Sequence, residues 1–179
     1  MFRIGQYIVY SNFGICRVEA IGKLNFIHNT QKEYYTLRPP YTTSNERIYV
    51  PVNSSVFMRN AITREEAFFY LDHLKDMEVK VVQSKKPGFL AAHYQELINT
   101  SDINGYLRLF KEIYQKEKLM KNCGKKLGQV DLRFYQLAER MLSKEFSIAL
   151  QETPDCSKKR LCAAASCQSV VENIVSRGA

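Results

Sequence analysis

The segment "FRIGQYIVYSNFGICRVEAI", Phe2 to Ile21, predicts how the first part of the chain folds. Its residues "YIVY" have high β propensity, and "NFG", Asn12 to Gly14, is a typical turn sequence. After the turn, residues alternate as in a strand that has one face on a core, with Cys16, Val18 and Ala20 on the inward side. We therefore expect two strands joined by a tight turn, with Cys16 as a small core residue.

Two more segments continue the β pattern. "EYYTLR", Glu33 to Arg38, is stopped by Pro39 and Pro40, and "RIYV" follows at Arg47 to Val50. About five short strands within residues 1–60, joined by tight turns, predict a small SH3-like β-barrel rather than an open sheet.

The segment "NERIYVPVNS" contains a strand whose outer face is unusual. Alternation puts Ile48 and Val50 on the core side and Arg47 and Tyr49 on the outer side. An outward arginine beside an outward tyrosine marks this face as a candidate binding surface, because interface centres favour both residue types.

From Thr63 onward the period of the apolar residues becomes helical. Thr63 and Glu66 have the spacing of a capping box, which predicts the start of a helix. Apolar stripes that need partners predict an all-α helical bundle over residues 61–150. Three further helices are expected: one over Phe89–Ile98, one after a cap at Ser101–Asp102, and one from about Gln129 to Leu150.

The final segment, residues 151–179, is expected to be a linker, "QETPDCSKKR", followed by a last helix over Leu161–Val175. The predicted fold class is therefore α+β in two domains, a small β-barrel followed by a helical bundle.

The chain is basic, with 26 lysines and arginines against 18 acidic residues and a net charge of +8. Between Lys111 and Lys126 there are six lysines and two glutamates. This balance fits an anionic partner such as nucleic acid, and it also fits a solvated basic surface.

Localisation follows from what the sequence lacks. No apolar run approaches the roughly 20 residues that span a bilayer, and "MFRIGQYIVY" has no signal-peptide core. The five cysteines are odd in number and irregularly spaced, which favours a reducing compartment. We expect a cytoplasmic protein with no membrane partner.

Catalytic motifs are also missing from the sequence. The three histidines, His28, His73 and His93, form no metal-binding pattern, and there is neither a Walker loop nor GxGxxG. We expect a protein that is not an enzyme and that uses no cofactor, no metal and no small-molecule substrate.

The order of these motifs resembles one family. "FRIGQYIVYSNFGICRVEAI", "KEYYTL" and "IYVPV" resemble the opening of CarD/CdnL proteins, whose SH3/Tudor-like barrel is shared with the polymerase-interacting domain of transcription-repair coupling factors. "TSDINGYLRLFKEIY" and "KKLGQVDLRFYQLAERMLSKEFSIAL" resemble helices of the second CarD domain, so the resemblance extends over about residues 1–150.

The resemblance implies a bacterial transcription regulator whose barrel binds the RNA polymerase β subunit. It assigns polymerase contact to Arg47 and Tyr49, and to Lys23, which lies near a family arginine. The family usually has arginine at the position of Tyr49, so Arg47, on the same face, is expected to take over its role. The alternative is that Tyr49 covers a neighbouring strand of its own barrel.

For the second domain, the resemblance implies contacts to promoter DNA that stabilise the open complex. The family inserts a tryptophan wedge, but this chain has no tryptophan, and the aligned position is Pro87. Phe89 is the nearest aromatic and is either a minor-groove wedge or an ordinary core residue of its helix. Sequence-independent phosphate contacts are expected from Lys85, Lys86, Lys116, Lys118, Lys121, Lys125 and Lys126.

Two alternatives remain open from the sequence. The first is a polymerase-binding adaptor without a DNA wedge, which recruits a partner through its helical domain or its C-terminal extension. The second is a redox or metal sensor built on Cys156, Cys162 and Cys167.

Overall fold

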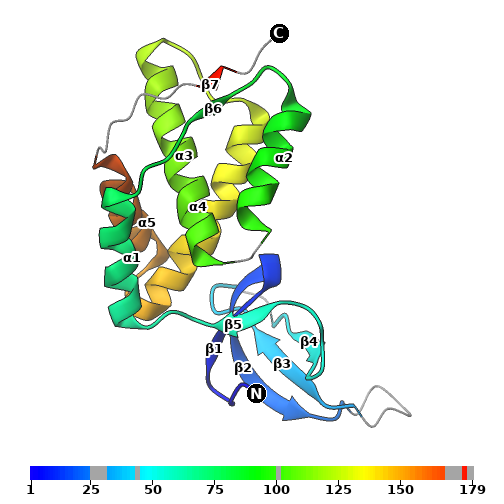
Figure 1. Cartoon of the computed structure of the whole chain (residues 1–179). Helices are drawn as coiled ribbons and strands as arrows, with labels where there is room; N and C mark the ends of the chain where they lie inside the picture. The colour runs from blue at the N-terminus through cyan, green and yellow to red at the C-terminus, as the bar shows by residue number, and fades with distance from the viewer. Residues whose placement is uncertain (25–31, 43–44, 100–101, 168–174, 177–179) are drawn as a thin grey trace. The chain divides into compact units, whose positions relative to one another are not determined.

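A computed structural model describes residues 1–24, 32–42, 45–99, 102–167 and 175–176. The chain divides into two compact units, unit 1 over Met1–Ile62 and unit 2 over Thr63–Ala179. Figure 1 shows a sheet in the first unit and a group of helices in the second, which is an α+β fold. None of the helices in the described ranges has the length and apolar character that crossing a bilayer requires.

The described residues of unit 1 form a five-stranded antiparallel sheet with the strand order β4-β3-β2-β1-β5. Its core is formed by Ile8, Cys16, Val18, Tyr35, Leu37 and Val50. In this order β4 and β5 are the two edge strands, so closure of the sheet into a barrel is not confirmed. The strands are β1 (Tyr7–Tyr10), β2 (Gly14–Gly22), β3 (Tyr34–Arg38), β4 (Ile48–Pro51) and β5 (Met58–Asn60), with a 3₁₀ turn at Ser11–Phe13.

Strand β2 is irregular at Glu19. Val18 pairs with Leu37 and Ala20 pairs with Thr36, so Glu19 is the extra residue of a β-bulge. Cys16 and Val18 are buried as the alternation predicts, but Ala20 is exposed and Ile21 packs against the core instead. The prediction for Ala20 was wrong because a bulge reverses which face the following residues take.

The described residues of unit 2 form five helices, which are labelled in Figure 1. Helix α4 has the predicted bounds. The predicted capping box is present at the start of α1: Thr63 N donates to Glu66 Oε2 at 2.7 Å, and Glu66 N donates to Thr63 Oγ1 at 3.2 Å. Asp102 occupies the N-cap of α3, but its carboxylate accepts a bond from the Asn104 side chain rather than from the helix backbone. The elements are α1 (Arg64–Asp76), β6 (Val82–Gln83), α2 (Pro87–Ile98), α3 (Ile103–Asn122), α4 (Gln129–Leu150), α5 (Pro154–Ser166) and β7 (Val175–Ser176), with β6 and β7 paired in parallel.

The predicted linker after Leu150 is instead mostly helix. Helix α5 begins at Pro154, directly after Thr153, whose hydroxyl accepts a bond from Cys156 N at 3.3 Å. Leu161, Ala164 and Ala165 are buried, and α5 packs against α4 and α1. The expected helix over Leu161–Val175 therefore starts earlier and ends at Ser166, and residues 168–174 of that expectation lie outside the described ranges.

Candidate functional site

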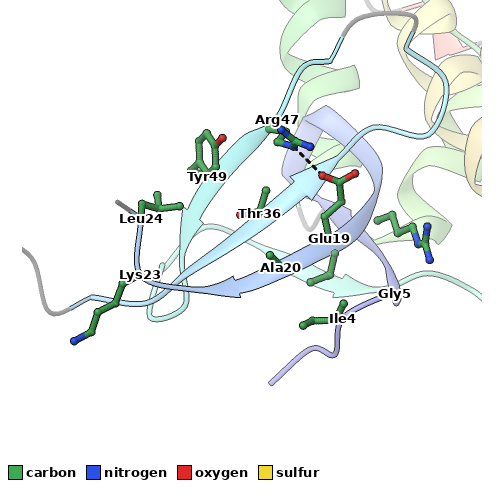
Figure 2. A pocket seen from close by; sticks show the side chains of 11 residues that line it. Ile4, Gly5, Glu19, Ala20, Lys23, Leu24, Thr36, Arg47 and Tyr49 are labelled. Carbon is green, nitrogen blue, oxygen red and sulfur yellow. Dashed lines mark hydrogen bonds and ion pairs between the residues drawn. The ribbon is translucent and has the colours of Figure 1, made fainter. Parts of the chain in front are cut away.

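One face of the sheet in unit 1 carries a hollow of about 710 Å³. The three residues expected to contact polymerase, Lys23, Arg47 and Tyr49, all line it, as Figure 2 shows. Arg17 and Glu19 line it as well. Its charged lining residues are thus three cations and one carboxylate, which leaves the hollow basic.

Glu19 orients two arginines, of which Arg47 lines the hollow. Arg47 Nε donates to Glu19 Oε2 at 2.9 Å, and Arg38 Nη1 donates to Glu19 Oε1 at 3.3 Å. The hydrogen bond from Arg47 is the main cause that holds the pKa of the Glu19 carboxyl below its usual value. Both arginine side chains stay about half exposed, so they are oriented by Glu19 and remain accessible to a partner.

Tyr49 occupies the outer face of edge strand β4. Its neighbour Val50 is buried in the core, and Tyr49 pairs in register with Thr36 of β3. Tyr49 is 39% exposed, and Figure 2 shows it on the same side of the sheet as Arg47. The predicted facing of this strand is therefore confirmed.

The candidate DNA-binding residues at the start of α2 are all exposed. Lys86 is the N-cap of α2, Lys85 precedes it, and the backbone N of Lys86 donates to Ser84 Oγ at 3.1 Å. Phe89 is 46% exposed, because the buried face of α2 follows Leu90, Tyr94 and Ile98, about 100° around the helix from Phe89. The reading of Phe89 as an ordinary core residue was wrong.

The lysines of α3 and the α3–α4 connection divide into two kinds. Lys118, Lys121, Lys125 and Lys126 are exposed; Lys118 lies over the Tyr114 ring at 5.0 Å, and Lys121 pairs with Glu117 at 2.8 Å. Lys116 is buried and unavailable for a phosphate, so its assignment as a DNA contact is corrected.

Lys116 belongs to a buried polar cluster that joins α2, α3 and α4. Lys116 Nζ donates to Asp131 Oδ1 at 2.8 Å and to the Tyr94 hydroxyl at 3.3 Å, while that hydroxyl donates to Asp131 Oδ1 at 2.7 Å. Burial, and then the bond to Asp131, raise the pKa of Tyr94 above its usual range. Sequence reasoning missed this cluster, because nothing in a lysine-rich segment distinguishes a buried lysine from its exposed neighbours.

The three C-terminal cysteines do not come together in a ligand set. Cys156 and Cys167 are exposed and Cys162 is partly buried. Burial raises the pKa of the Cys162 thiol, which makes it less reactive. Within the described ranges, no group of three or more histidine, cysteine and acidic side chains has the arrangement of a metal site.

A comparison with protein families matches one part of the chain. Residues 2–62 match the model of the CarD-like/TRCF RID domain, and these residues coincide with unit 1. No curated protein matches the chain. The resemblance noted in the sequence is confirmed for the first unit and remains a prediction for residues 63–150. Residues 2–62 of this chain are therefore similar to the CarD-like/TRCF RID domain.

Proposed function

We propose that this protein is a non-enzymatic bacterial transcription regulator that docks on the RNA polymerase β subunit through unit 1. The observation that carries the proposal is the position of Lys23, Arg47 and Tyr49 around one hollow of an RID domain. In the proposed fold, the two edges of the sheet approach each other as an SH3/Tudor-like barrel, as the family match supports.

The hollow suits an acidic partner surface that also presents an apolar group. The excess of cations attracts carboxylates, and Tyr49 offers an aromatic face with a polar tip. Glu19 acts as a positioning residue, because it holds the Arg47 guanidinium before the partner arrives and so reduces the ordering cost of binding.

The helical unit is proposed to steady promoter DNA. Helices α2 and α3 pack on each other and are joined by a short connection, so the start of α2 and the end of α3 lie at the same end of unit 2 (Figure 1). Lys85, Lys86 and Phe89 are thereby grouped with the exposed lysines that follow Lys116. Such a basic end binds phosphates without reading sequence, and Phe89 is the proposed wedge.

The proposed mechanism is a bridge between polymerase and DNA in the cytoplasm. A protein that binds the open promoter complex more tightly than the closed one shifts the equilibrium by the ratio of the two affinities. The adaptor alternative keeps the polymerase contact and gives the helical unit a protein partner instead of DNA.

The lifetime of promoter open complexes separates these two alternatives. Lys85→Glu/Lys86→Glu and Phe89→Ala are expected to shorten the lifetime while polymerase binding stays unchanged. Lys159→Glu, on helix α5, is the control for a charge reversal at another exposed lysine. The wild-type protein should lengthen the open-complex lifetime less at high salt than at low salt, and this dependence on salt should be weaker for the double lysine variant. Unchanged lifetimes in both variants would favour the adaptor.

A further inference from the structure

The outer face of α1 exposes an aromatic side chain. Phe69 is 65% exposed, and only Met1 and Ile4 are more exposed among the large apolar residues in the described ranges. Its neighbour Phe68 is also exposed but is partly covered by Arg64, whose guanidinium carbon lies 5.6 Å from the ring centroid. Phe69 instead stacks on His73, one turn away, with the two rings parallel and 6.2 Å apart.

The inner face of α1 is held firmly without any contribution from Phe69. Ala67, Leu71 and Leu74 are buried, and the capping box closes the N-terminal end. At the other end, the buried ammonium of Lys111 donates to the backbone oxygens of Leu74 at 2.5 Å and Lys75 at 2.8 Å. Lys111 thus satisfies terminal carbonyls of α1 and fixes the helix against α3. The outer face is therefore presented on a rigid support.

Charge identifies the kind of partner that this face fits. Three acidic residues share the side of the helix on which Phe69 lies, because they are spaced from it by about one or two helical turns: Glu65 at i−4, Asp72 at i+3 and Asp76 at i+7. All three are exposed; Lys75 forms an ion pair with Asp72 at 2.6 Å, and the buried Lys111 ammonium lies at the Asp76 end of the helix. In a protein with a net charge of +8, this face is locally acidic. It repels nucleic-acid phosphates and attracts lysine and arginine.

We propose that the α1 outer face, formed by Glu65, Phe69, Asp72, His73 and Asp76, docks a cationic segment of a partner protein. An apolar side chain of that segment packs on Phe69 and His73, and its lysines or arginines pair with the surrounding carboxylates. The aromatic rings would then form the apolar centre of the interface, and the carboxylates around them its charged rim. The site lies in unit 2 and does not depend on the polymerase contact proposed for unit 1.

The probe is a labelled synthetic peptide with leucines on one helical face and lysines elsewhere, titrated with the full chain by fluorescence anisotropy. Two comparison peptides replace all leucines by serine or all lysines by glutamate. The first peptide should bind, the serine peptide should bind about tenfold more weakly, and the glutamate peptide should not bind. Absence of binding by the leucine–lysine peptide would overturn the proposal.

Two variants with matched controls locate the binding. Phe69→Ser is expected to weaken binding of the first peptide about tenfold, whereas Phe13→Ser, at an exposed phenylalanine of unit 1, should leave that binding unchanged. Glu65→Lys/Asp76→Lys should abolish the binding, while Asp155→Lys, at an exposed acid of α5, should not. Equal binding by Phe69→Ser and the wild type would contradict the proposal.

Two further measurements exclude other roles for Phe69. The melting temperature of the Phe69→Ser variant should equal that of the wild type. A fall of several degrees would mean that another part of the chain covers the Phe69 ring. Sedimentation should give the same mass for the wild type and the variant. A concentration-dependent dimer that disappears in Phe69→Ser would make a second copy the occupant and would also overturn the proposal. Because polymerase is absent from these assays, their outcome is separate from that of the proposed function.

Discussion

Lys116 and Lys118 lie two residues apart on α3 and illustrate how much burial decides the role of a single lysine. The Lys118 ammonium is exposed above the Tyr114 ring, whereas the Lys116 ammonium is enclosed by Asp131 and Tyr94. Removing one partner of a buried ion pair is strongly destabilising, because it leaves the other charge buried without compensation. At this scale, lysines that the sequence groups together separate into a structural set and a surface set.

Replacing Asp131 tests this distinction. Asp131→Ala leaves the Lys116 ammonium buried without its carboxylate, so the free energy of unfolding should fall by about 3–5 kcal/mol. Urea denaturation measures the change. The control Lys118→Ala should alter the free energy by no more than about 0.5 kcal/mol. Equal, small losses in both variants would mean that Lys116 is not enclosed as described.

His93 makes part of the stability dependent on pH. Its Nε2 lies 3.0 Å from Glu112 Oε2, and that hydrogen bond is the main cause that raises the pKa of His93 while burial opposes it. A raised folded-state pKa means that the stabilisation is complete below the unfolded pKa of about 6.5 and is lost as pH rises through the folded value. The wild type should therefore exceed His93→Gln in unfolding free energy at low pH, with a gap that narrows as pH rises. A gap of constant size across that range would contradict the assignment.

At the scale of the elements, the accuracy of the sequence prediction depends on how strongly each pattern repeats. Helix α4 was predicted with its observed bounds, because its apolar stripe persists over six turns' worth of sequence at a helical period. Strand β2 was predicted only as far as Val18, because no residue type marks the bulge at Glu19. Glu19, the bulge residue, accepts a hydrogen bond from Arg47, which lies 28 residues away in the sequence. Because the bulge could not be predicted, this pairing of side chains in the hollow could not be predicted either.

Helix α5 was missed over its first two turns because polar residues dominate there. Its buried side chains are few and mostly small, so its sequence shows little helical periodicity and resembles that of a linker. Leu161 is the largest of them, and it is fully buried where α5 packs in unit 2.

Leu161→Ala measures what α5 contributes to the fold. The unfolding free energy should fall by about 2–5 kcal/mol if α5 is an integral part of unit 2. Cys156→Ser, at an exposed position of the same helix, is the control and should have almost no effect. A negligible loss in Leu161→Ala would return residues 154–166 to the predicted role of a linker.

On the scale of the whole molecule, each proposed activity belongs to one compact unit. Unit 1 carries the basic hollow, and unit 2 carries both the basic end near Phe89 and the acidic face around Phe69. Opposite charges on separate surfaces of one basic chain allow different partners to be distinguished by electrostatics. Variants in one unit are therefore expected to leave direct binding by the other unit intact, whereas the bridge between polymerase and DNA requires both units.

The most direct test of the account is binding of the full chain to the isolated lobe of the RNA polymerase β subunit, measured by calorimetry. The wild type should bind, and Arg47→Glu/Tyr49→Ala should bind at least about tenfold more weakly. Lys32→Glu/Tyr41→Ala is the matched control: it makes the same charge change and removes a tyrosine of similar exposure, and neither residue lines the hollow. This control should bind with wild-type affinity. Absence of binding by the wild-type chain, or equal binding by the Arg47/Tyr49 variant, would contradict the account.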